Sequence, residues 1–134
     1  MARLYREAPL NSVWEGSGNV MCLDVLRAMV REPQSIEALR DELRSAMGAD
    51  KRYDNFVAEL FASVLDGAHM EFRARTTVER IALALQASVL LKAGNASIAD
   101  PFIATRLGGH YGRNFGTLAY GTDVDTLIER AMPA

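Results

Sequence analysis

Residues 77–94, with the sequence TVERIALALQASVLLKAG, decide the fold class of this chain. Apolar side chains recur along this stretch at helical spacing and on nearly every side of the helix. A helix that is apolar almost all round has to be covered by other elements, so we predict a buried central helix that ends at Gly94. Thr76 and Glu79 have the spacing of a capping box, which would open or reinforce this helix.

Three shorter amphipathic helices are predicted before the central one. The first uses apolar residues on one face between positions 20 and 30 and ends before a proline, which disfavours helical backbone in the preceding residue. Capping residues and glycines bound the other two. The predicted boundary residues are Glu32 and Pro33 for the first helix, Ser35 and Gly48 for the second, and Asp50 and Gly67 for the third.

Two more helices are predicted after the central one. Asp100 and Pro101 would start the first, because proline suits the first helical position, and the glycine pair 108–109 would end it. Residues 122–132 form the second. No sustained alternation of apolar and polar residues indicates strands. The chain is therefore predicted to be one all-α domain over residues 1–134, a helical bundle of about five to six helices.

Composition excludes several classes of protein. The 134 residues are 49% hydrophobic and 24% charged, which is a globular balance, and the net charge of -2 does not suit a uniformly basic nucleic-acid binder. Cys22 is the single cysteine, so no internal disulfide forms and we expect a reducing, cytoplasmic setting. The longest apolar run, residues 81–91, is too short to span a bilayer, so no membrane partner is expected. His69 and His110 lack neighbours at ligand spacing, which predicts no metal site.

A second stretch, residues 14–19, has the composition of a site. Trp14, Glu15, Gly16, Ser17, Gly18 and Asn19 place a carboxylate beside a large aromatic ring on a turn just before a helix. Partial desolvation raises the pKa of such a carboxylate and makes it a better base, while exposed amide groups at the helix start favour an anion. An ordinary helix N-terminus, where the dipole simply favours a Glu, is the alternative that these residues leave open.

The longer stretch from Arg6 to Arg27 resembles a known family. It is similar to the acyl-CoA dehydrogenase segment in which an aromatic residue, Glu, Gly and Thr or Ser precede the last long helix of the catalytic fold. The match to the AidB branch, which belongs to the adaptive response to DNA alkylation, is nearly continuous over about 25 residues. The resemblance implies that residues 1–31 hold the catalytic segment and this last helix, and that residues 32–134 form a helical C-terminal extension.

The resemblance assigns roles to five residues. Glu15 matches the base that removes the α-proton of an acyl-CoA thioester while the β-hydride passes to FAD. Trp14, Gly16 and Ser17 match positions that line the flavin and the thioester. Arg27 matches an arginine near the mouth of the active site, where pairing with Glu15 would lower the pKa of that carboxyl and weaken it as a base.

The resemblance also limits what the chain does alone. In this family the flavin site is built from helical and β domains that are missing or truncated here, so we expect FAD in a full-length parent and none in the isolated chain. Without a pocket to orient the acyl-CoA, the chain alone is predicted to be inactive.

Two other functions stay open. The AidB branch implies a module for duplex DNA. Between residues 67 and 121 six bases outnumber three acids, but we prefer the simpler explanation that two helical faces of opposite charge attract each other or solvent. A third possibility is an interaction domain, and a homo-oligomer is expected. The candidate phosphate-binding residues are Arg73, Arg80, Arg106 and Arg113.

Overall fold

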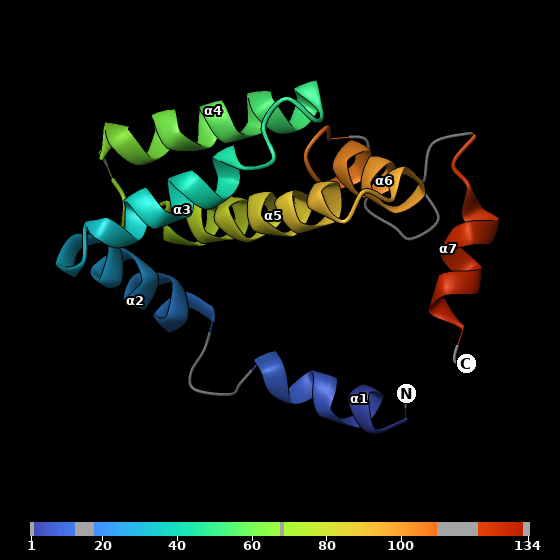
Figure 1. Ribbon diagram of the computed structural model, residues 1–134. Helices are drawn as coiled ribbons and strands as arrows, with labels where there is room; N and C mark the ends of the chain where they lie inside the picture. The colour runs from blue at the N-terminus through green and yellow to red at the C-terminus, as the bar shows by residue number, and fades with distance from the viewer. Residues whose placement is uncertain (1, 13–17, 68, 110–120, 133–134) are drawn as a thin grey trace.

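The computed structural model describes residues 2–12, 18–67, 69–109 and 121–132, with the side chains of residues 11 and 12 excepted (Figure 1). Every regular element in this part of the chain is a helix, which confirms the predicted all-α class. The elements are α1 (Ala2–Glu7), the 3-10 helix η1 (Ala8–Ser12), α2 (Gly18–Arg31), α3 (Gln34–Arg44), α4 (Lys51–Asp66), α5 (Ala74–Lys92), α6 (Ala96–Arg106) and α7 (Val124–Ala131).

The central helix is α5, as its apolar pattern predicted. It packs against α2, α3, α4 and α6, and Figure 1 shows it running through the middle of the bundle. Ala84 and Ala87 are completely buried in it, and their small side chains let neighbouring helices approach closely. Leu43, Val57 and Ile103 bring the apolar faces of α3, α4 and α6 into the same core.

A buried hydrogen bond ties α3 to α4 inside this core. Tyr53 and Leu43 are both fully inaccessible to solvent, and Tyr53 Oη donates to the Leu43 carbonyl at 2.8 Å. That carbonyl lies in the last turn of α3, where it also accepts a hydrogen bond of 3.3 Å from the backbone N–H of Ala46. The tyrosine therefore gives this carbonyl a second and shorter hydrogen bond, and its own buried hydroxyl gains an acceptor.

Several predicted helix boundaries are confirmed. The Asp50 carboxylate accepts hydrogen bonds from the backbone N–H groups of Arg52 at 2.7 Å and Tyr53 at 3.4 Å, so Asp50 caps α4. Gly67 ends the same helix with a φ of 63°, a left-handed conformation that glycine adopts without a steric penalty. The predicted last helix appears as α7, which begins after Asp123.

Two predicted starts are wrong. Ser35 lies inside α3, which follows Pro33. Thr76 lies inside α5, which begins at Ala74, so the predicted capping box does not open that helix, and its role in reinforcing the helix stays a prediction. Asp100 and Pro101 do not start α6, because that helix begins at Ala96 and carries the proline in its interior. Burial of Ala99 against the core favours helix before the proline, so tertiary packing overrides the local signal.

Two helices lie at the edges of the domain. α1, which the sequence did not predict, and α7 contain no buried residue. α7 contacts α6, and Figure 1 shows it on the opposite side of the domain from α2. No helix in the part of the chain that the structure describes combines the length and apolar character needed to cross a membrane.

Candidate functional site

The site that the sequence predicts lies at the start of α2. Trp14, Glu15, Gly16 and Ser17 fall outside the described residues, and α2 begins directly after them at Gly18. The first turn of α2 is therefore the described element that comes directly after this segment in the chain.

An arginine of α5 packs against that first turn. Arg75 Nη1 donates a hydrogen bond of 3.0 Å to Oδ1 of Asn19. A β-carbon added to Gly18 would lie 3.4 Å from the same nitrogen, so glycine leaves room for the guanidinium beside the helix start. The first amide groups of a helix carry partial positive charge, and a cation there adds to it. This end of α2 therefore favours negative charge close to it.

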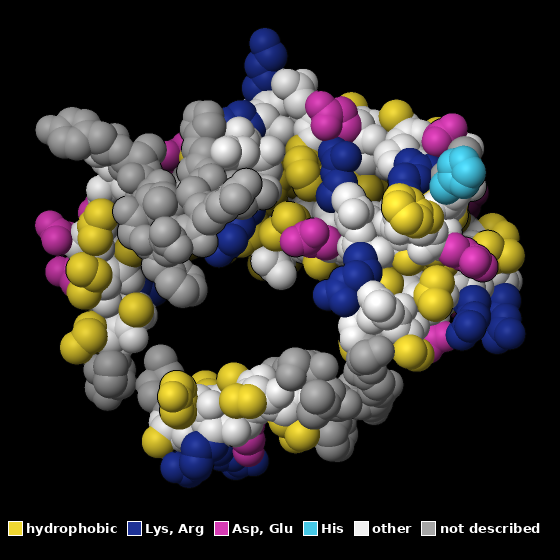
Figure 2. All heavy atoms as spheres, turned by 180° about the vertical axis from the view of Figure 1, so that it is seen from behind, with side chains coloured by type: hydrophobic (Ala, Val, Ile, Leu, Met, Phe, Trp, Pro, Cys, Tyr) yellow, Lys and Arg dark blue, Asp and Glu magenta, His cyan; other side chains and the backbone are white. Residues whose placement is uncertain are grey.

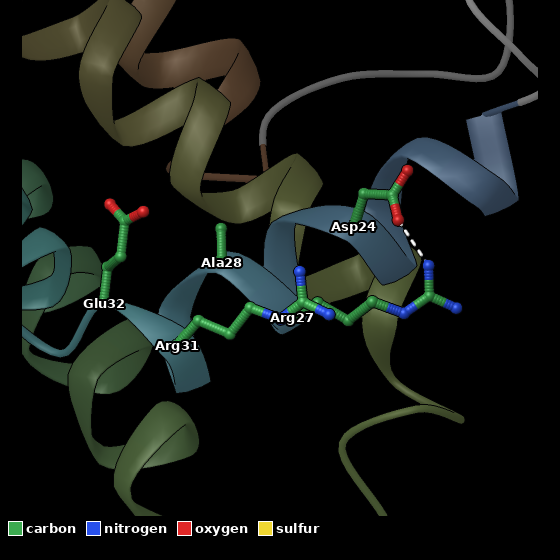
Figure 3. A pocket seen from close by; sticks show the side chains of 5 residues that line it. All are labelled: Asp24, Arg27, Ala28, Arg31 and Glu32. Atoms are coloured by element: carbon green, nitrogen blue, oxygen red, sulfur yellow. Dashed lines mark hydrogen bonds and ion pairs between the residues drawn. The ribbon is translucent and has the colours of Figure 1, made fainter.

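Arg27 has its own partner on α2. Its Nη1 lies 2.5 Å from Asp24 Oδ1, three residues earlier, and both side chains are more than half exposed. Figure 3 shows this contact at a shallow hollow that Ala28, Arg31 and Glu32 complete. The described ion pair of Arg27 is thus a local one, and its predicted pairing with Glu15 stays a prediction.

The predicted phosphate-binding residues have acidic neighbours. Arg73 Nη2 lies 3.2 Å from Asp66 Oδ2, and its Nη1 donates to Ser63 Oγ at 2.9 Å. Arg80 Nη2 lies 3.1 Å from Glu59 Oε2, with its guanidinium carbon 4.7 Å from the ring centre of Phe56. Both arginines therefore reach α4, whose carboxylates offset their charge.

The other two members of that set are elsewhere. Arg106 is exposed at the end of α6, where it lines a hollow with Glu79 and Phe102. Arg113 lies outside the described residues. The structure thus places Arg73 and Arg80 together along α4 and gives Arg106 a separate position.

Sequence reasoning assigned no role to Arg52, which links two carboxylates. Its Nη2 donates to Asp50 Oδ2 and Asp100 Oδ1, both at 2.6 Å, and so joins the start of α4 to α6. The hydrogen bond from Arg52 is the main reason that the pKa of Asp50 is lowered, and the two carboxylates raise the pKa of Arg52. We interpret this cluster as a helix cap reinforced by charge, because Asp50 also bonds the first amides of α4.

Metal binding finds no support in the described residues. Within residues 2–12, 18–67, 69–109 and 121–132 no three His, Cys, Asp or Glu side chains gather as a metal site would require. His69 is exposed, and His110 lies outside this part of the chain. Cys22 is half-buried on α2.

These features define a small helical domain in which an arginine of the central helix binds the first turn of α2, the helix that follows the candidate base-bearing segment in the chain. Sixty residues of the chain, or 45% of it, are 45% identical to a protein of Escherichia coli (strain K12) named "Putative acyl-CoA dehydrogenase AidB". The match confirms the resemblance to the AidB branch. It covers only 11% of that protein's length. No family model and no solved structure matches the chain.

Proposed function

We propose that this chain is a C-terminal piece of an FAD-dependent acyl-CoA dehydrogenase-like flavoprotein of the AidB type. The observation that carries the proposal is the 45% identity to AidB over 60 residues. The motif around Glu15, between a tryptophan and two glycines, supports it. In the longer protein the reaction is the α,β-dehydrogenation of an acyl-CoA thioester, and FAD, when bound, supplies the acceptor for the β-hydride.

Glu15 is the proposed base. Its carboxylate accepts the proton from the α-carbon of the thioester, and the electron pair of that C–H bond forms the new double bond as the hydride leaves the β-carbon. Arg75 and the first amides of α2 favour negative charge at the start of that helix, which follows Glu15 directly in the chain. Arg27, two turns along α2, is proposed as a residue at the mouth of the site.

The described residues do not by themselves fit FAD. The residues that the resemblance assigns to the flavin, Trp14, Gly16 and Ser17, all lie outside the described part. Their described neighbours supply one cation and one helix start, which suit a single anionic group rather than a flavin. The isolated chain is therefore proposed to need the rest of the longer protein for cofactor binding and for activity.

The test is made in that longer protein. Glu15→Gln keeps the shape of the side chain but removes the proton acceptor, so exchange of the α-deuterium of a bound acyl-CoA should stop while FAD stays bound. Glu7→Gln is the matched control, since Glu7 pairs with Arg3 on the exposed surface of α1. Unchanged exchange in Glu15→Gln would remove Glu15 from this role. A coding sequence without a flavin-binding region upstream would overturn the assignment as a fragment.

The isolated chain offers a second check. Its far-UV circular dichroism should show helical minima, and its visible spectrum should lack flavin absorbance. Stoichiometric FAD on the purified chain would contradict the proposed dependence on the longer protein.

A module for duplex DNA remains the alternative from another class of function. The resemblance to the AidB branch supports it, whereas the ion pairs of Arg73 and Arg80 with α4 speak against these two residues as free phosphate ligands. Variants that remove the acidic partners of Arg73 and Arg80 distinguish the two functions, as described in the Discussion.

A further inference from the structure

The first turn of α2 is held by a polar contact more than by burial. Leu26 is the buried residue of α2, two turns beyond its start, whereas Val20 and Met21 in the first turn are 47% and 46% exposed. A helix end with so little buried apolar surface unfolds locally at low cost in free energy. The hydrogen bond of 3.0 Å from Arg75 Nη1 to Asn19 Oδ1 therefore contributes a large share of the order at this end of the helix.

Arg75 itself stands on a packed part of the domain. Ala74 and Thr77, on either side of it in the first turn of α5, are only 4% and 3% exposed, so the backbone that carries the guanidinium is fixed. A β-carbon on Gly18 would lie 3.4 Å from Arg75 Nη1, which is ordinary van der Waals contact. Arg75 thus links the central helix directly to the start of α2.

The segment that carries the candidate base, residues 13–17, lies in the chain between η1 and α2. On the η1 side α1 contains no buried residue, and its Leu4 and Tyr5 are 65% and 83% exposed. Figure 2 shows apolar side chains exposed along α1, at the bottom of the view. Within the described part of this chain, the packed bundle therefore reaches the segment from the α2 side.

Chain length limits how far Glu15 can lie from the contact between Arg75 and Asn19. Asn19 follows Glu15 by four residues, and four residues span at most about 14 Å even when fully extended. A shift of the first turn of α2 therefore moves the end of the segment with it. Proton transfer is sensitive to such shifts, because a displacement of about 1 Å can cost about a hundredfold in rate.

We propose that Arg75 is a positioning residue for the base. By bonding Asn19 it fixes the first turn of α2, and so it determines where the segment that carries Glu15 ends. The inference rests on the proposed function of Glu15 in the longer protein. Arg75 neither transfers a proton nor touches the acyl-CoA, and it acts on the reaction through Asn19. The helical C-terminal extension thereby contributes to the reaction through α5.

The first experiment measures exchange of the α-deuterium of a bound acyl-CoA in the longer protein, per mole of bound FAD. Arg75→Met and Asn19→Ala each remove one side of the hydrogen bond, so the maximal exchange rate should fall about tenfold in each. FAD content and the half-saturating concentration of acyl-CoA should not change. The double variant should be no slower than either single variant, because both changes remove the same contact. Arg44→Met, exposed at the end of α3, is the matched control and should exchange like the wild type.

A conservative variant separates the hydrogen bond from the charge of Arg75. Asn19→Asp keeps an acceptor oxygen opposite the guanidinium, so its maximal exchange rate should stay close to that of the wild type. If the charge alone matters, Arg75→Met is slow but Asn19→Ala exchanges at the wild-type rate, and the positioning role is wrong. Loss of FAD with an unchanged rate per bound FAD would reduce Arg75 to a structural role and would also overturn the inference.

Amide exchange in the isolated chain provides a measurement that needs no FAD. Asn19→Ala should speed exchange in the first turns of α2, whereas the higher helix propensity of alanine by itself predicts slower exchange. Asn19→Asp should exchange no faster than the wild type, because a carboxylate is favoured at a helix start. Unchanged or slower exchange in Asn19→Ala would show that its contact with Arg75 does not order this end of α2, and the inference would fail.

Glu15→Gln, measured alongside in the longer protein, separates this inference from the proposed function. If Glu15→Gln stops exchange of the α-deuterium but Arg75→Met and Asn19→Ala do not slow it, Glu15 is the base and the positioning role of Arg75 is refuted. Exchange that survives Glu15→Gln would refute the proposed function, and the inference with it.

Discussion

Arg75 at the start of α5 donates a hydrogen bond of 3.0 Å to Asn19 at the start of α2, across 56 positions of sequence. The contact joins the helical extension to the helix that follows the candidate base. Residues 32–134 are therefore not attached to α2 by chain connectivity alone, since α5 also holds the first turn of that helix.

This contact predicts a local effect of Arg75→Met. The methionine keeps most of the aliphatic stem but removes the charge and the donor, which should cost about 1 kcal/mol locally. Amide exchange in the first turns of α2 should become about fivefold faster, with little change in the melting temperature of the core. Arg44→Met, at the exposed end of α3, is the control. Equal exchange in the two variants would show that Arg75 does not order the start of α2.

The cap of α4 predicts a pH-dependent stability. Arg52 lowers the pKa of the Asp50 carboxyl below its usual 3.8. Because the folded pKa lies below the unfolded one, the stabilisation is complete above about pH 4 and is lost as the pH falls through the folded value. Asp50→Asn should lower the free energy of unfolding by about 1 kcal/mol at neutral pH, and the difference should disappear in strong acid.

Urea titrations at pH 7 and at about pH 2 measure this difference. Asp41→Asn provides the control, because Asp41 is 78% exposed and 3.8 Å from Arg44, a pair expected to contribute little. A stability difference for Asp50→Asn that persists unchanged in acid would contradict the role of its charge.

Tyr53→Phe should weaken the core. The variant keeps the ring but removes the hydroxyl that donates to the buried Leu43 carbonyl, and the loss of this hydrogen bond should cost about 1 kcal/mol by chemical denaturation. Burial also raises the pKa of Tyr53. The folded protein therefore favours the neutral phenol, and stability in the wild type should fall as the pH rises above the ordinary tyrosine pKa of 10.0. An identical alkaline profile in Tyr53→Phe would contradict this linkage.

Removing the acidic partners of Arg73 and Arg80 tests the alternative function, a module that binds duplex DNA. Glu59→Gln with Asp66→Asn removes the carboxylates that lie 3.1 Å and 3.2 Å from Arg80 and Arg73. If these arginines bind phosphates, duplex affinity at low salt should rise severalfold in this variant and fall with added salt. Arg73→Gln with Arg80→Gln should reduce it. Duplex binding that neither double variant changes would exclude Arg73 and Arg80 from a DNA surface.

Local sequence signals predicted which helices form more reliably than they predicted where each helix begins. The apolar run around Ile81 predicted the central helix, and Asp50 and Gly67 predicted the ends of α4, because each depends on a few adjacent residues. Pro101 misled the prediction of α6, since its preference for a first helical position competes with the burial of Ala99 two residues before it. The burial of α6 against α4 and α5 depends on how the helices pack together, so the residues near Pro101 in the sequence cannot predict it.

The sequence by itself determined the helical class, the central place of α5 and the motif that carries Glu15. Only the tertiary structure decided that Arg75 reaches Asn19 and that Arg73 and Arg80 turn toward acids of α4. The physical reason is that periodicity and capping act within a helical turn or two. Partners in different helices depend on the face that each helix presents after packing, which the buried surface of the whole domain determines.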